Sequence, residues 1–578
     1  MLWTLLIVFG CSSSDTSKDA ALDGESEVED RLALSVDFPQ PGSFDNQGSG
    51  TVTGTVETGA GSVETVTING ESFPVGETGR FSADMGWEPG IQMLSSQVED
   101  SAGARSTDGR AFHAGPVNGP SEWIGNAIRM EIDGEILDDD DDIPDDISGL
   151  LELAFEDPAL LEPLIGSPVD MGDAIFTPTA ISLGRARVDI VPNDGYLEAV
   201  VSLDAIAIDF DLLGVSWYSW VESTGSTSVL SVDAAMTSTV VASNGIVRVD
   251  VTEVEVAIAG MSLTMEWVPD FMESTIAEWT ETFIEQAIED AFRAQVATFV
   301  EDSLTSFAVG PTFSDDLGMD LRLSSLEIAQ SGIRFEVDAR VMALDAIELP
   351  PHAGSLRTVG AAPDWPTYKT QPFWAAIDDD ILNQLGFAFW QTGLATDIEM
   401  EGMVLGLLSG GALAEPLGPS DTVVMSLNLP PVLTPTESDD WAAVVTIGEW
   451  EVVFNRNDGE VLRFALNASA HVNADVAELG VIRIEIDSRP DHVEQAIGVR
   501  EVPDSVDPGE AVALLEGMLP LLLGNSANFA PDIPIPTLAL DEFIAVEATE
   551  GKILRVDQPE IKLEANGWLL LQAGLAVD

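Results

Sequence analysis

Two hydrophobic periods follow one another along the chain and predict its main elements. From residue 175 to about 270, apolar and polar residues alternate, as in the run from Val247 to Val251, where valines flank Arg248 and Asp250. A period of two places the valines on one face of a strand and the charges on the other. The turn signals Asn193-Asp194-Gly195 and Asn244-Gly245 separate such runs, so the sequence predicts long antiparallel hairpins.

A helical period replaces this alternation from Pro269 to about Phe307. Apolar residues there recur three or four positions apart and form a broad stripe. Packing on a sheet would account for such a stripe, and part of it is expected to pack in that way. The functional interpretation is that the stripe also covers a slot for an apolar ligand, lined by Ile276, Trp279, Phe283, Ile284, Ile288 and Phe292.

Strand patterns surround this helix on both sides. Short alternating runs with a hairpin signal at Asn69-Gly70 fill residues 32–115 and predict a small β-sandwich. The hairpin "I-N-G…F-P-V…G-x-F-S" and the later turn at Asp100, Ala102 and Gly103 resemble bacterial immunoglobulin-like repeats, which commonly serve as spacers. In the second half, a hairpin around Asn457-Asp458-Gly459 precedes a helix whose start is signalled by Asp507-Pro508-Gly509-Glu510. The predicted fold class is α+β, mostly β.

Composition narrows the set of partners. The chain has 578 residues, enough for several domains, and a formal net charge of -77. So large an acidic excess opposes contact with phosphate backbones, and we therefore expect no nucleic-acid partner. Adaptation to a saline habitat explains the acidity as well as any functional role does. The single cysteine, Cys11, rules out an internal disulfide and a thiolate metal cluster.

The position of Cys11 suggests a lipid anchor. Met1 to Gly10 is apolar and has the length of a signal-peptide core, about half of what a bilayer-spanning helix needs. Residues 8–11, V-F-G-C, resemble a bacterial lipobox, although Phe9 departs from its usual small residue. The polar tether 12–31 that follows suits a domain held away from a membrane. The resemblance implies a signal peptide and lipobox at 1–11, acylation of Cys11, and an outer-membrane lipoprotein facing the periplasm or the cell surface.

An acidic stretch closes the segment 116–146, which we expect to be a linker. Asp138 to Asp142, Asp145 and Asp146 offer oxygen ligands of the kind that Ca²⁺ prefers. Adjacent carboxylates cannot all converge on one ion, and no D-x-D-x-D-G loop is present. A solvated hinge is therefore the favoured interpretation of this run, and a calcium site the alternative. We expect no other metal and no cofactor.

Three stretches resemble the tubular lipid-binding superfamily, the family of bactericidal/permeability-increasing protein, lipopolysaccharide-binding protein and cholesteryl ester transfer protein. They are residues 268–271 with the long helix that follows, the strand and helix of 373–399, and the I-P-I-P motif of 533–536 with its closing strands. The resemblance implies two tandem barrels, each a curved antiparallel sheet plus a helix, at 147–345 and 421–578, joined by a central segment at 346–420. It also implies that the ligand is a phospholipid or another acyl-chain lipid. The family's basic tip and disulfide have no counterpart here, so endotoxin binding is not implied.

Catalytic motifs do not stand out in the sequence. His113, His352, His471 and His492 lie far apart, and the chain has no G-x-S-x-G elbow, Walker loop or G-x-G-x-x-G fingerprint. Carboxylates are so abundant that a pair of them carries no information about glycoside hydrolysis. We therefore expect a lipid-binding protein, membrane-attached through its anchor, rather than an enzyme. The alternative is a surface adhesin or structural protein with an Ig-like spacer and no ligand.

Overall fold

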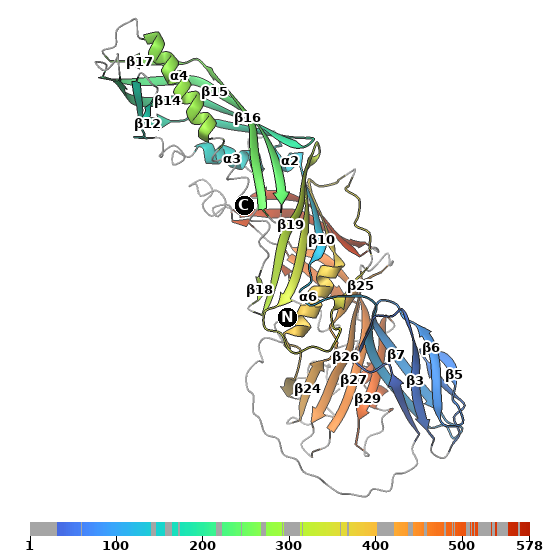
Figure 1. The fold of residues 1–578 in the computed structure, drawn as a ribbon. Coiled ribbons are helices and arrows are strands. Elements are labelled where there is room, and N and C mark those ends of the chain that lie inside the picture. The colour runs from blue at the N-terminus through green and yellow to red at the C-terminus, as the bar shows by residue number, and fades with distance from the viewer. Residues whose placement is uncertain are drawn as a thin grey trace.

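The structure is a computed structural model whose described residues form a mostly-β α+β protein, as the sequence predicts (Figure 1). The residues it describes are 32–58, 61–139, 146–156, 165–170, 174–215, 222–243, 246–266, 273–291, 293, 312–314, 316–358, 360–366, 369–401, 421–436, 443–455, 459, 461–478, 481–487, 489, 492–503, 509, 511–513, 515–517, 519, 533–534, 538–539, 553–564 and 567–577. Cys11, the tether 12–31 and Phe292 therefore lie outside the described residues, as does most of the helix expected after Asp507.

The first described region is a β-sandwich. One sheet contains β1 (Ala33–Phe38), β3 (Ser49–Glu57) and β6 (Arg80–Gly86). The other runs in the order β2 (Phe44–Asp45), β8 (Arg105–Ala114), β7 (Gly90–Glu99), β4 (Thr65–Ile68) and β5 (Glu71–Pro74). Inward-facing apolar residues of both sheets, such as Val52, Ile68 and Phe112, form one core. Asn69 and Gly70 make the β4–β5 turn with positive φ, which suits these two residue types.

The next region is a sheet of long strands carrying two helices. Its order is β11 (Val169–Asp170), β12 (Ala174–Ser182), β14 (Tyr196–Gly214), β15 (Glu222–Ser243) and β16 (Ile246–Ala259), with β13 (Ala186–Asn193) paired to β14 and β17 (Ser262–Met265) paired to β15. Helices α3 (Ile147–Glu156) and α4 (Glu273–Ala291) pack on it. Figure 1 shows α4 lying along one face of the sheet. The predicted long hairpins are therefore present, and β13 and β14 are joined at Asp194-Gly195.

A central sheet connects distant parts of the sequence. Its order is β18 (Thr312–Ser314), β19 (Leu317–Ala329), β20 (Gly332–Ala343), β10 (Ile124–Asp133), β22 (Phe373–Asp378), β33 (Trp568–Val577), β32 (Ile553–Glu564) and β31 (Leu538–Ala539). Strand β10 comes from the segment that we expected to be a linker, and the short helix α2 (Gly134–Leu137) follows it. The alternation of Ile128, Met130 and Ile132 with polar residues explains why this segment forms a strand.

The C-terminal sheet runs in the order β23 (Ile398–Glu401), β24 (Thr422–Leu427), β26 (Ala443–Asn455), β27 (Val461–Glu478), β28 (Val481–Ile486) and β30 (Ile533–Pro534). Strand β25 (Val432–Pro435) pairs with β26, and β29 (Val493–Glu501) pairs with β27. Helix α6 (Asp379–Gln391) packs between this sheet and the central one, and a small pair of strands, β9 (Val117–Asn118) and β21 (Ser355–Leu356), lies nearby. Among the described helices, none is both long enough and apolar enough to cross a membrane.

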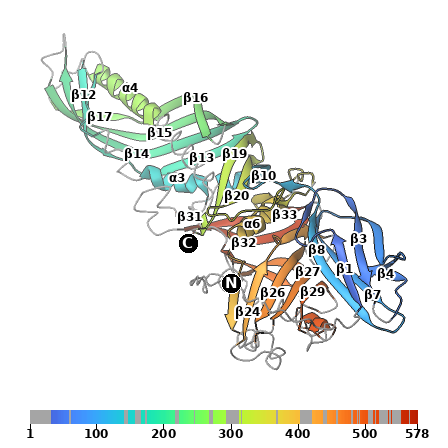
Figure 2. The same ribbon diagram turned by 60° about the horizontal axis from the view of Figure 1, so that its bottom comes forward.

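The sandwich is docked on the C-terminal sheet rather than held apart as a spacer. Figure 2 shows the two side by side, with β8 next to β29. Gly109 and Gly498 make this approach close, because a Cβ at either position would overlap with backbone of the opposite strand. The junction thus depends on two residues without side chains.

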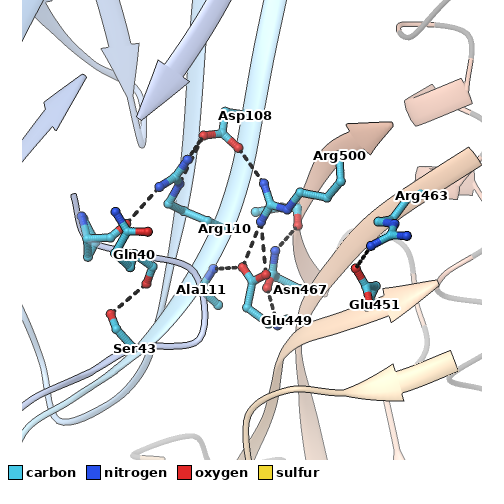
Figure 3. A network of polar contacts seen from close by, with 12 residues as sticks. Gln40, Ser43, Asp108, Arg110, Ala111, Glu449, Glu451, Arg463, Asn467 and Arg500 are labelled. Carbon is cyan, nitrogen blue, oxygen red and sulfur yellow. Dashed lines mark hydrogen bonds and ion pairs between the residues drawn. The ribbon is translucent and has the colours of Figure 1, made fainter. Parts of the chain in front are cut away.

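Buried charges complete this junction (Figure 3). Arg500 bridges the two regions, with N–O distances of 3.0 Å both to Asp108 of β8 and to Glu449 of β26. The backbone N–H of Ala111 donates to Glu449 at 2.7 Å, and Arg110 pairs with Asp108. Burial raises the pKa of Glu449, and the charge of Arg500 opposes that shift. The junction is therefore directional, since each charge has a fixed partner.

Candidate functional site

The stripe predicted on the long helix faces the core of the long-stranded sheet. Ile276, Phe283 and Ile284 are buried, with 0%, 3% and 2% of their surfaces exposed. Trp279 and Ile288 are half-buried and pack against the same core. The structure thus brings five of the six predicted residues together on one face of α4, and the sixth, Phe292, lies outside the described residues.

Aromatic packing holds α4 on the sheet. The ring of Phe283 lies 4.4 Å from that of Phe176 on β12, measured between centroids, and Phe176 lies 4.4 Å from Phe210 on β14. All three rings are buried. The contacts assign Phe283 to ordinary core. The sequence alone was compatible both with this role and with ligand binding.

Burial changes from the centre of this sheet to its edge. The inward residues of β14, from Leu197 to Leu212, are buried. Those of β16, which ends the sheet among its described strands, are only half-buried, although they are equally apolar. We call the following half-buried residues of β16, β17 and α4 the apolar seam: Val249, Val251, Val254, Val256, Ile258, Leu263, Met265, Trp279 and Ile288. The apolar layer is therefore incompletely covered along this edge.

The lengths of the elements explain the incomplete cover. Helix α4 has 19 described residues and, at the helical rise, is about 28 Å long. Strand β16, whose inward face is half-buried, has 14 residues and extends about 46 Å. The described part of α4 is therefore shorter than this strand, and α3 packs instead against β13. At one end of α4, Arg293 donates to the carbonyl of Val251 at 3.0 Å and pairs with Glu289 at 3.0 Å.

The acidic run at 138–146 is tied into the fold at its described positions. Asp146 is buried and accepts hydrogen bonds from the backbone N–H groups of Gly149, at 2.6 Å, and Asp139, at 2.8 Å, which places it at the start of α3. Asp138 accepts from the backbone N–H of Ile190 at 2.9 Å. Burial raises the pKa of Asp146. These carboxylates have protein donors and do not form the solvated hinge that we expected, and residues 140–145 lie outside the described residues.

A second acidic group lies where β22 meets α6. Asp378 caps the helix by accepting from the N–H of Asp380 at 3.0 Å. Asp380 accepts from Asn118 at 3.0 Å and from the N–H of Thr358 at 2.7 Å. Asp379 accepts from the Thr358 hydroxyl at 2.6 Å, and burial raises the pKa of Asp379 to about 8. Burial thus favours the protonated form of this carboxyl. The group joins a strand to a helix, in the order that the sequence predicts for residues 373–399.

Comparison with known proteins identifies the sandwich most clearly. The family model described as "Glucodextranase, domain B" matches residues 33–114, which cover the sandwich strands. No curated protein sequence matches the chain. Among solved structures, a lipopolysaccharide binding protein aligns with 78% of this chain and 99% of its own at 12% identity and a TM-score of 0.40.

Two further structures, of P47 from Clostridium botulinum, also align along most of the chain. The alignment with P47 of Clostridium botulinum E1 covers 79% of this chain and 100% of the P47 chain, at 8% identity and a TM-score of 0.23. The alignment with P47 from Clostridium botulinum A2 covers 78% of this chain and 97% of the P47 chain, at 6% identity and a TM-score of 0.24. Scores of this size do not establish a shared fold, so the contacts of the chain itself must indicate its function.

Proposed function

We propose that the chain is an envelope lipoprotein that binds a phospholipid or another acyl-chain lipid along the apolar seam. The observation that supports this most directly is the half-buried inward face of β16 beside Trp279 and Ile288. An apolar row at a sheet edge invites aggregation unless something covers it. An acyl chain laid in the seam would gain about 0.8 kcal/mol for each CH₂ removed from water. Binding of this kind requires no catalytic group, and we assign the chain no enzymatic activity.

The same proposal extends to the rest of the chain. Residues 147–345 would form the first tubular lipid-binding unit and residues 421–578 the second, around the C-terminal core that includes Phe454 and Phe464. Half-buried Trp450, Met425 and Leu462 border that core as the seam borders the first one. If the protein also moves lipid between membranes, the lipid would pass from the apolar layer of one unit to that of the other.

Charge placed in the seam tests the ligand site. We expect Trp279→Asp and Ile288→Asp to abolish uptake of a fluorescent phospholipid, because an unpaired carboxylate beside acyl chains is strongly unfavourable. Melting temperature should fall only modestly, since both positions are already half-exposed. The matched control is Ala257→Asp, which adds the same charge to the exposed face of β16. If each variant with lowered uptake also unfolds the domain, the seam is ordinary core and the assignment is wrong.

Two measurements test the anchor and the presence of a ligand. Cys11→Ser should move the protein from the detergent phase to the soluble fraction, and unchanged partitioning would reject acylation at this residue. Organic extraction of protein purified from its own membrane should release lipid. An extract without lipid would favour the adhesin or structural alternative.

A further inference from the structure

Two of the four histidines meet an aspartate on the C-terminal sheet. His471 lies on β27, Asp487 directly follows β28, and His492 directly precedes β29. One ligand atom from each residue, a ring nitrogen or a carboxylate oxygen, lies within 4.8 Å of the other two. This convergence could not be predicted from the sequence, because a whole hairpin separates the two histidines.

The strand pairing explains why these residues meet. Strand β27 pairs with β29 up to Ala470, opposite Val493, and with β28 from Val472, opposite Ile486. His471 occupies the position between, where the partner of β27 changes. Asp487, the first residue after β28, therefore lies beside His471, and its N–H donates to the His471 carbonyl at 2.8 Å. Backbone hydrogen bonds thus fix the position of the cluster.

Side-chain contacts then orient the donors. The Asp487 carboxylate lies 2.6 Å from Nδ1 of His492 and accepts from the Arg489 guanidinium at 2.8 and 2.6 Å. The rings of His471 and His492 are nearly perpendicular, at 85°, with centroids 6.4 Å apart. Asp487 is 3% exposed, whereas Arg489 is 58% exposed. The carboxylate is thus anchored inside, and its cationic partner can turn toward solvent.

We propose that His471, Asp487 and His492 bind a transition-metal ion of the Zn²⁺ class, which would clasp the β28–β29 connection to β27. Two imidazole nitrogens and one carboxylate oxygen form a donor set typical of Zn²⁺, and Ca²⁺ prefers oxygen alone. Donors around Zn²⁺ lie about 2.0 to 2.2 Å from the ion, so the three groups need only small shifts, in which the ion replaces the hydrogen bond between His492 and Asp487. Arg489 neutralises the carboxylate in the metal-free protein, and the ion would take over that charge.

Cobalt titration of the full chain tests this site, because Co²⁺ bound by nitrogen ligands absorbs visible light. Excess Ca²⁺ is added to occupy the many surface carboxylates. We expect one Co²⁺ equivalent with a characteristic spectrum, displaced by Zn²⁺. His471→Ala and His492→Ala should each weaken binding by about 100-fold. His352→Asn is the matched control, since His352 is exposed, far from the cluster in sequence, and has a positive φ of 67° that asparagine tolerates.

A substitution at Arg489 separates metal binding from a purely structural role. Arg489→Gln removes, from an exposed position, the cation that competes for Asp487 and repels an incoming metal ion, so the fold should persist and Co²⁺ affinity should rise about tenfold. A structural cluster of ion pairs would not gain metal affinity from this change. The proposal is overturned if the wild-type chain gives no Co²⁺ spectrum, if the doubly substituted His471→Ala/His492→Ala chain gives the same one, or if Arg489→Gln leaves the affinity unchanged.

Discussion

The contact between α4 and its sheet differs in kind from the contact between the sandwich and the C-terminal sheet. Helix α4 is held by apolar side chains such as Phe283 and Ile276, and its border with β16 is half-buried. The sandwich is held by Asp108, Arg500 and Glu449, with glycine backbones in close approach. The sandwich contact joins segments far apart in the sequence and is fixed by charge pairs, whereas α4 packs mainly on strands that closely precede it and is held by non-directional contacts.

This difference indicates which contact can accommodate a ligand. Apolar contacts have no preferred direction, so an acyl chain can take the place of a side chain in such a contact at small cost. A buried charge that loses its partner is left uncompensated, and the junction therefore cannot open partway. We infer that the sandwich acts as a fixed part of the C-terminal region, whereas the border between α4 and β16 can adjust its width.

The largest effect is expected at the centre of the α4 contact. Phe283→Ala removes a buried ring that packs on Phe176, and it should cost about 4 kcal/mol of unfolding free energy. Trp279→Ala, at a half-buried position on the same helix, should cost clearly less. Denaturant unfolding followed by far-UV circular dichroism, which does not depend on the replaced tryptophan, measures both. Equal costs would contradict the distinction between core and seam.

Breaking the polar junction should have the next largest effect. Arg500→Ala leaves Asp108 and Glu449 without their shared cation, and removal of one partner of a buried pair costs about 3 kcal/mol. We expect the low end of the usual range because Arg500 is 22% exposed. Thermal unfolding should also separate into more transitions, because the sandwich would no longer be held on the C-terminal sheet and would unfold independently. A single unchanged transition would show that the junction contributes little.

The carboxyl of Asp379 adds a pH-dependent contact where β22 of the central sheet meets α6. Its folded pKa is about 8 and its ordinary value 3.8, so the folded state holds the proton more tightly. The stability that this proton contributes is complete below about pH 4 and is lost progressively as the pH rises toward about 8. Asp379→Asn should remove the part of that slope that lies above about pH 6, because burial raises the pKa of the neighbouring Asp378 only to about 6, while lipid uptake at the seam stays the same. Parallel pH profiles of the two proteins would refute the assignment.

The smallest effect is expected at a more exposed ion pair of the C-terminal sheet, between Arg463 on β27 and Glu451 on β26. Arg463 lies 3.5 Å from Glu451 and is 43% exposed (Figure 3). Because solvent screens such a pair, Arg463→Ala should cost less than about 1 kcal/mol. This substitution is the matched control for Arg500→Ala, since both remove an arginine from neighbouring strands. A cost as large as that of Arg500→Ala would mean that burial does not distinguish the two pairs.

Local patterns in the sequence were sufficient for the elements whose signals lie within a few residues. The Asn69-Gly70 turn, the alternation of β14 and the strand that leads into α6 are confirmed. The stripe on α4 also faces a core as predicted, because helical periodicity fixes which residues share a face. Whether a position on that face is packed or half-open depends on the length of the opposing strand, which the stripe itself does not contain.

Features that depend on long-range register could not be predicted. The alternation in β10 was visible, but its place between β20 and β22 depends on pairing with strands far along the chain. The bridge from Arg500 to Asp108 and the meeting of His471 with His492 likewise depend on which strands become neighbours. The residues around a charged side chain do not indicate its distant partner. Because the chain has so many carboxylates, the few that form these contacts cannot be recognised in the sequence.

The place of β10 also dictates an order of assembly. This strand leaves the sandwich early in the chain, yet its neighbours are β20 and β22, and β22 in turn pairs Phe373 with Ala573 of β33. Strands so far apart in the sequence pair slowly, because the chain must lose the entropy of closing a long loop before any stabilising contact forms. A growing chain can complete the sandwich at once, but its central sheet must wait for the last strands to arrive. Until then, the apolar edges of β10 and β22 need shielding, and a factor that keeps the chain extended would improve the yield of folded protein.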